Sequence, residues 1–119
     1  MQALIAEFQQ FAQKMDTTHF RLSTIFLGGG TPSLLMPAHV EALLNEIQNY
    51  FTINDRVEIT MEANPGEAPF EKLRAFNDLG VNRLSMGVQS LQPELLRFMS
   101  RIHTADQAKI TFEIGRAHV

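Results

Sequence analysis

The stretch Thr24–Leu35, TIFLGGGTPSLL, decides the fold because an apolar, partly β-branched run ends in three consecutive glycines. Apolar and β-branched residues favour a strand. Ordering three glycines in succession costs more backbone entropy than ordering any other three residues. One glycine is enough for a tight exit from a strand. The additional glycines therefore predict either that a ligand comes close to bare backbone here or that the turn is purely structural.

The composition limits the class of protein. The chain has 119 residues, enough for one small domain, and is 45% hydrophobic and 19% charged, as soluble proteins commonly are. Its net charge of -3 offers no basic stripe for a phosphate backbone, so we expect no nucleic-acid partner. No apolar run reaches the ~20 residues of a membrane span, and no secretory signal is visible, so we expect a cytoplasmic protein.

Helical and extended patterns alternate along the sequence and are joined by short connections. Thr104 and Gln107 have the spacing of a capping box, which predicts the start of the last helix. The alternation of the two patterns predicts an α/β fold of consecutive right-handed βαβ units with a parallel sheet. The expected strands are 22–27, 57–64 and 82–90, and the expected helices are 4–15, 37–51, 69–79, 93–99 and one beginning at 104.

The second and third expected strands are apolar on one face and polar on the other. Parallel strands covered by helices on both sides are apolar on both faces. The pattern therefore favours the inner wall of an open barrel with a ligand cavity, and the alternative is a sheet face open to water. The polar face consists of Glu58, Thr60, Glu62, Asn64, Ser85, Gly87 and Gln89.

Polar and small residues also gather at the carboxyl ends of all three strands, in Gly28–Thr31, Glu62–Asn64 and Gln89–Ser90. This is the edge at which β/α folds bind ligands. The three glycines do not form a Walker loop, because no Gly-Lys-Ser/Thr follows them. They also miss the dinucleotide motif, because Ser33 stands where that motif has its third glycine.

Four motifs in order and spacing carry a family resemblance: GGGTPS at 28–33, EITMEANPG at 58–66, GVNRLSMGVQS at 80–90 and RIH at 101–103. Over residues 24–108 the chain resembles the radical S-adenosylmethionine (SAM) proteins of the oxygen-independent coproporphyrinogen III oxidase group. Within that group it is most similar to the HemW-type branch, whose members are described as haem chaperones.

The resemblance implies part of an open, TIM-like (β/α)6 barrel, with about three parallel strands and their flanking helices. For the full-length parent it implies SAM and a [4Fe-4S] cluster as cofactors, and a role in haem or porphyrin metabolism with haem or porphyrinogen as a further ligand. A membrane-associated haem recipient is an expected partner. A haem chaperone, a coproporphyrinogen III oxidase that removes carboxyl groups oxidatively, and a chain inactive on its own remain alternatives, and the oligomeric state is open.

The same resemblance implies that Gly29, Gly30 and Thr31 contact the methionine portion of SAM. Glu62 and Gln89 would bond the amino or hydroxyl groups of SAM, and Arg101 would pair with its carboxylate or another anionic group. A solvated residue at a helix end is the alternative for Arg101, and His103 is expected to be structural. The implied cofactor-binding residues are Gly29, Gly30, Thr31, Glu62, Gln89 and Arg101, with no catalytic residue and no metal ligand.

The sequence departs from the family because the first barrel strand with its Cys-x3-Cys-x2-Cys loop is missing, and the chain has no cysteine. The last family strands and the C-terminal domain are missing as well. Three irons of a cluster would lack ligands. We therefore expect an internal fragment, with residues 1–112 as a partial radical SAM core. Residues 113–119, EIGRAHV, are expected to be a non-native tail, because Gly115 should end the last helix and the peptide back-translates to a sequence resembling a sequencing adapter.

Overall fold

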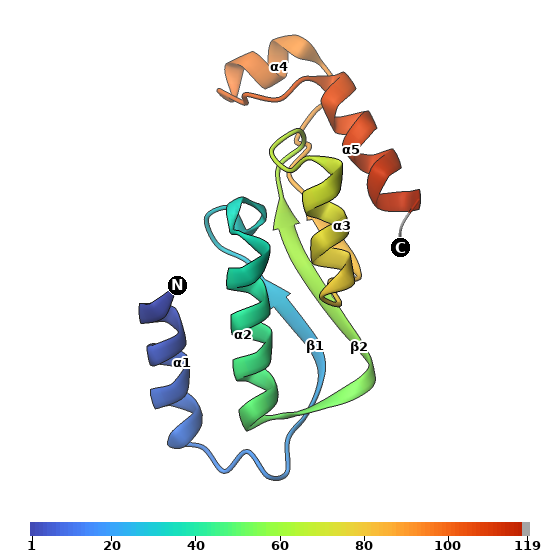
Figure 1. Ribbon diagram of the computed structural model, residues 1–119. Helices are drawn as coiled ribbons and strands as arrows, with labels where there is room; N and C mark the ends of the chain where they lie inside the picture. Colours follow the sequence, from blue (N-terminus) through green and yellow to red (C-terminus); the bar gives the residue numbers. More distant parts are fainter. Residues whose placement is uncertain (118–119) are drawn as a thin grey trace.

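The computed structural model describes residues 1–117 and consists of a parallel three-stranded sheet with helices packed over one face (Figure 1). The expected α/β order and parallel pairing are confirmed, with β2 in the centre of the sheet. The strands are β1 (Arg21–Leu27), β2 (Thr52–Ala63) and β3 (Arg83–Met86). The helices are α1 (Gln2–Gln13), the short 3-10 helix η1 (Pro32–Leu34), α2 (Pro37–Tyr50), α3 (Phe70–Asp78), α4 (Pro93–Phe98) and α5 (Ala105–Ala117).

The core lies between the apolar face of the sheet and helices α2 and α3. Each fully buried side chain of this size stabilises the fold by about 1.5–3 kcal/mol. Because these residues fill the space between the two layers, the polar face of β2 is directed away from the helices. The main buried residues are Ile25 from β1, Ile59 and Met61 from β2, Val40, Leu43 and Leu44 from α2, and Leu73 and Phe76 from α3.

The third strand is shorter than the alternating pattern predicts. Extended structure was expected over 82–90, but β3 ends at Met86. The Gly87 amide still donates to the Ala63 carbonyl oxygen at 3.0 Å, and Gln89 then adopts a left-handed φ of 63°. Few residues other than glycine adopt such a φ. The chain therefore leaves the sheet in a tight turn at the point where ligand-binding residues were expected.

The start of β2 and the end of α5 also differ from those expected. β2 begins at Thr52 rather than at Val57, and its register with β1 shifts between Leu22 and Thr24. α5 continues through Gly115 to Ala117, so the prediction that this glycine ends the helix is wrong. A glycine inside a helix costs about 1 kcal/mol relative to alanine, which the rest of the helix can offset. The non-native origin of 113–119 remains a prediction, and residues 118–119 lie outside the described part.

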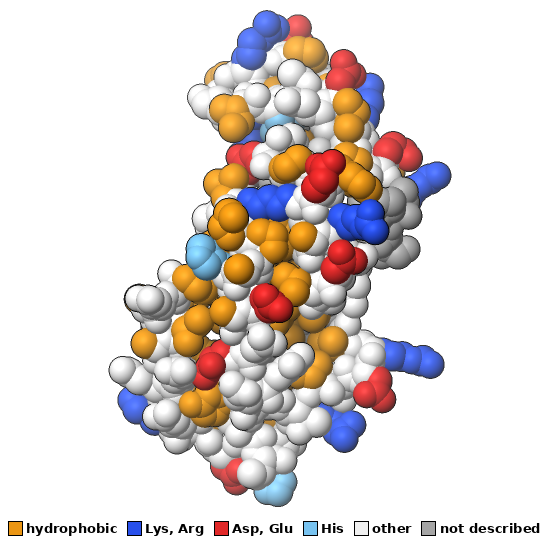
Figure 2. Space-filling model, in the orientation of Figure 1, with side chains coloured by type: hydrophobic (Ala, Val, Ile, Leu, Met, Phe, Trp, Pro, Cys, Tyr) orange, Lys and Arg blue, Asp and Glu red, His pale blue; other side chains and the backbone are white. Residues whose placement is uncertain are grey.

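The molecule is elongated, 50 × 27 × 22 Å, because α4 and α5 extend beyond the end of the sheet (Figure 1). Figure 2 shows hydrophobic side chains exposed among the charged groups of the surface. The most exposed are Phe98 at the end of α4, at 87%, and Ile102, at 83%. Within the described residues, no helix has both the length and the apolar character needed to cross a membrane.

Candidate functional site

A cleft of about 500 Å³ opens at the carboxyl ends of the strands. Its size is within the range of small-molecule sites. The residues come from the loop after β1, the ends of β2 and β3, the turn after β3, and the segment between α4 and α5. All the predicted site residues except Gly29 line the cleft. The lining residues are Gly30, Thr31, Glu62, Ala63, Asn64, Ser85, Met86, Gly87, Gln89 and Arg101.

The glycine loop presents bare backbone beside the cleft. Gly29 and Gly30 have φ values of 84° and 58°, so both need the conformational freedom of glycine. A side chain added at either residue would meet no atom within 4 Å, so the space beside them is open. The Gly29 amide donates to Glu62 Oε2 at 3.0 Å, which joins the loop to the end of β2. The loop geometry thus needs two of the glycines, and it leaves their backbone accessible to a ligand.

Arg101 is held inside the cleft by hydrogen bonds to two strand ends. Its Nη2 donates to Asn64 Oδ1 at 2.9 Å and to the Gly87 carbonyl oxygen at 3.1 Å. Asn64 Nδ2 in turn donates to Thr31 Oγ1 at 3.4 Å and to Glu67 Oε2 at 3.0 Å. Arg101 is therefore a half-buried, anchored cation rather than a solvated residue at a helix end.

Gly87 is the point at which three polar side chains of the cleft converge. A Cβ atom at this position would lie 2.9 Å from Asn64 Oδ1, 3.1 Å from Arg101 Nη2 and 3.5 Å from Gln89 Nε2. The first distance is shorter than side chains tolerate, so a Cβ here would force the Asn64 amide to shift, and with it the anchor of Arg101. The need for glycine at Gly87 is therefore spatial, whereas at Gly29 it is conformational.

Asn64 and Gly87 are functional candidates that were not among the predicted cofactor-binding residues, although both belong to the predicted polar face. Asn64 lies two residues after Glu62, on the same polar face and at the end of the strand. This position was the sequence signal from which its role could have been predicted. Gly87 interrupts a strand pattern, and such glycines often mark a close approach of other groups. His103 is 4% exposed and its Nε2 lies 3.0 Å from the Val88 carbonyl oxygen, in agreement with the structural role expected for it.

The charges of the cleft are one carboxylate and one guanidinium. Among the residues that line it in the described part of the chain, Glu62 is the acidic group and Arg101 the basic group. An ammonium is bound well by a carboxylate, and a carboxylate by a guanidinium, because hydrogen bonds between charged groups are the stronger kind. The carboxylate and the guanidinium together therefore suit a zwitterionic ligand such as the α-amino acid end of a small molecule.

Comparison with known proteins gives the class to which this fold and site belong. Residues 5–118 match the radical SAM superfamily, and the chain belongs to this superfamily. Several of its relatives are named haem chaperone HemW, the branch that the four motifs indicated.

Three relatives illustrate the similarity. The haem chaperone HemW of Haemophilus influenzae is 37% identical over 98% of this chain and 30% of its own length. The mitochondrial radical S-adenosyl methionine domain-containing protein 1 of Mus musculus is 43% identical over 81% of this chain and 22% of its own length. The structure of coproporphyrinogen III oxidase from Escherichia coli, described as a radical SAM enzyme, matches with a TM-score of 0.85 and 29% identity, over 98% of this chain and 26% of that chain. The chain thus spans less than a third of each relative.

The superfamily implies SAM and a [4Fe-4S] cluster, and the residues present fit only the first. The cleft offers the charges, the bare backbone and the volume that an amino acid end requires. A [4Fe-4S] cluster is held by cysteine thiolates, and the sequence contains no cysteine. The described residues also contain no group of three His, Cys, Asp or Glu side chains that could hold a metal ion.

Proposed function

We propose that the cleft binds the methionyl end of SAM, and that the protein acts in haem metabolism as a HemW-like radical SAM protein. The observation that supports this most directly is that Glu62 and Arg101 line the same cleft beside bare glycine backbone. The methionyl end of SAM carries an ammonium and a carboxylate, and each has a group of opposite charge available.

Each residue of the cleft has a distinct task in this proposal. Glu62 is held through Oε2 by the Gly29 amide, and its other oxygen accepts a hydrogen bond from the ammonium. Arg101 is anchored through Nη2, and its remaining N–H groups bind the carboxylate. Gly30 and Thr31 offer backbone and hydroxyl groups to the same end of the ligand, and the amide of Gln89 serves the hydroxyl groups. SAM would supply the radical chemistry of the superfamily only together with a [4Fe-4S] cluster, for which this chain offers no cysteine ligand.

The haem-related role is proposed from the relatives, several of which are named haem chaperones. Haem as a ligand, a membrane-associated recipient and a cytoplasmic location belong to this proposal. A coproporphyrinogen III oxidase activity is the second candidate, because the matching structure is that of such an enzyme. The absence of cysteine supports the third candidate, that this chain by itself is inactive.

Nuclear magnetic resonance of the ¹⁵N-labelled chain tests SAM binding directly and can detect weak affinity. We expect SAM to shift the amide signals of Gly29, Gly30 and Gly87. Glu62→Ala should weaken binding roughly 10- to 100-fold, because a hydrogen bond to a charged group contributes about 1.5–3 kcal/mol. Glu41→Ala, on the exposed side of α2, is the matched control. Equal affinities for the Glu62 variant and the unchanged chain would place the ligand elsewhere.

A chimera separates the haem chaperone from the oxidase. Residues 5–112 replace the corresponding segment of the Haemophilus influenzae relative, and the product is titrated with haem and assayed for protoporphyrinogen formation. We expect haem binding without turnover of coproporphyrinogen III. Turnover would instead favour the oxidase, and loss of both properties would show that this segment does not replace that of the relative.

A further inference from the structure

The turn after β3 holds Gln89 in a strained conformation. The Val88 carbonyl oxygen accepts a hydrogen bond from the Ser90 amide at 2.7 Å, so Gln89 is the central residue of a γ-turn. Its φ of 63° gives the turn the rare, strained form with positive φ. A non-glycine residue keeps such a conformation only where its surroundings enforce it, and such residues are concentrated at functional sites.

His103 is the second donor to the same carbonyl. Its Nε2 lies 3.0 Å from the Val88 oxygen, and the residue is 4% exposed. A carbonyl oxygen can only accept, so Nε2 carries the proton and donates. Two positions earlier, Arg101 donates to the Gly87 carbonyl oxygen at 3.1 Å. The segment between α4 and α5 therefore holds two successive carbonyls of the turn.

The conformation of this turn fixes the position of the Gln89 side chain. Gln89 Nε2 and Arg101 Nη2 both lie beside the point where a Cβ of Gly87 would stand, at 3.5 and 3.1 Å. The alternating pattern of the sequence favours extended backbone up to Ser90, so the strained turn competes with continuation of the strand. The second hydrogen bond on the Val88 carbonyl oxygen, from His103 Nε2, favours the turn over continuation of the strand.

We propose that His103 is a positioning residue of the cleft. Through the Val88 carbonyl it keeps the backbone of Gln89 left-handed and so holds the Gln89 amide beside Arg101. The effect on a ligand rests on the proposed SAM site, whereas the effect on the turn is independent of it. The test therefore has one arm without ligand and one with SAM.

The first arm measures the turn in the ligand-free chain. His103→Leu removes the donor, and His103→Gln restores one, because its amide nitrogen is as many bonds from Cβ as the imidazole Nε2. We expect the leucine variant to lose the strong Hα–HN Overhauser effect of a left-handed Gln89 and the slow exchange of the Ser90 amide, and the glutamine variant to keep both. His39→Leu, at an exposed position of α2, is the control. Retention of both signals in the leucine variant overturns the proposal; His103→Met gives a second donorless variant if leucine prevents folding.

The second arm is a double-mutant cycle for SAM affinity. We expect His103→Leu to lower the affinity several-fold in the unchanged chain and to have no further effect in a Gln89→Ala background, because His103 acts through Gln89. Equal losses in both backgrounds would show a general structural effect and contradict the proposal. Absence of SAM binding by the unchanged chain would overturn the proposed function, and the first arm would still decide whether His103 holds the turn.

Discussion

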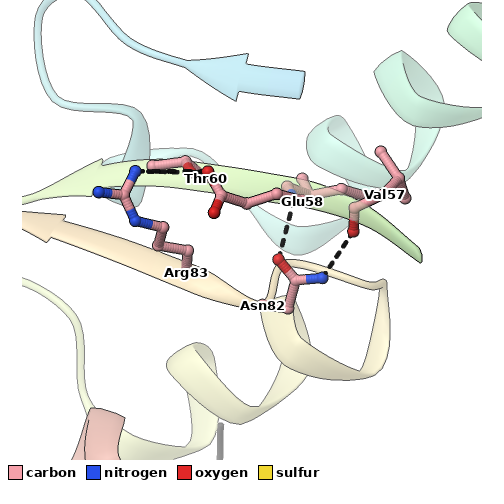
Figure 3. A network of polar contacts seen from close by, with 6 residues as sticks. Val57, Glu58, Thr60, Asn82 and Arg83 are labelled. Carbon is pink, nitrogen blue, oxygen red and sulfur yellow. Dashed lines mark hydrogen bonds and ion pairs between the residues drawn. The ribbon is translucent and has the colours of Figure 1, made fainter. Parts of the chain in front are cut away.

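Polar residues in the second half of β2 and at the start of β3 lie on the same face of the sheet as the cleft at the carboxyl ends of these strands, and the two groups differ because the cleft residues surround an open space. In the first group, Arg83 Nη1 at the start of β3 lies 3.4 Å from both Glu58 Oε1 and Thr60 Oγ1 of β2 (Figure 3). Thr60 is 1% exposed, although it belongs to the polar face. These side chains bind one another, and Thr60 Oγ1 also lies 3.2 Å from Glu58 Oε1.

Asn82 completes this first group by binding the backbone of β2. Its Oδ1 accepts from the Ile59 amide at 2.9 Å and its Nδ2 donates to the Val57 carbonyl oxygen at 2.8 Å (Figure 3). In the cleft, Glu62 is held through Oε2 and Arg101 through Nη2, and both side chains line a space of about 500 Å³. Similar residue types on one face thus bind one another at the start of β3 and line an open cleft at the strand ends, where we propose that a ligand binds.

The largest expected effect concerns the iron–sulfur cluster, which we expect this chain not to bind. We expect that anaerobic reconstitution with iron and sulfide leaves no visible charge-transfer absorbance after desalting, because thiolate ligands are missing. Iron and sulfide assays on the desalted chain provide the quantitative measurement. Stoichiometric retention of both elements would show that ligands other than cysteine hold a cluster.

Gly87→Ala should disturb the open site most strongly among single substitutions. Its Cβ would stand 2.9 Å from Asn64 Oδ1 and displace the anchor of Arg101. We expect SAM affinity, followed by amide shifts, to fall roughly 10- to 100-fold, the equivalent of one charged hydrogen bond. Gly115→Ala is the control, because its Cβ would make an ordinary contact of 3.5 Å with Leu84. If both variants bind SAM equally well, the convergence over Gly87 has no role in binding.

Asn82→Ala should affect stability and not binding. It removes two hydrogen bonds to the β2 backbone, each contributing about 0.5–1.5 kcal/mol, so the free energy of unfolding should fall by about 1–3 kcal/mol. Urea unfolding measures this change, with Asn45→Ala on the exposed side of α2 as the control. A loss of SAM affinity at unchanged stability would reverse the roles given to the two groups.

Glu58→Gln should have the smallest effect. Glu58 and Arg83 are 49% and 57% exposed, and pairs of this kind contribute at most about 1 kcal/mol. Urea unfolding at low and high salt should therefore show a small difference that salt reduces further. A loss of several kcal/mol would mean that the pair is shielded from water more completely than its exposure suggests.

The sequence was sufficient to predict the order of elements, the two faces of β2 and the edge at which the cleft lies. These features depend on the local spacing of apolar residues and on the rule that β/α folds bind ligands at the carboxyl ends of their strands. The capping box of α5 was also predictable, and Thr104 and Gln107 bond each other's amides at 2.8 and 3.1 Å.

Features that depend on distant contacts were not predictable. The donors that hold the turn around Gln89 come from Arg101 and His103, 14 and 15 residues from the carbonyls they bind. The pattern before the turn continues to alternate, so it gave no sign that the strand ends at Met86. The role of Asn64 depends on Arg101, 37 residues away. Such pairings arise from the fold and have no local signature.

Asn82 also has a consequence for the way in which the chain assembles. β3 has only 4 residues, so few backbone bonds distinguish its native alignment with β2 from one displaced by a single residue. Such a displacement would turn Leu84 toward the cleft and Ser85 toward the helices. The Asn82 amide meets both Val57 and Ile59 in the native alignment, and a misaligned strand would forfeit both bonds. This side chain therefore discriminates against a folding error before any ligand is present.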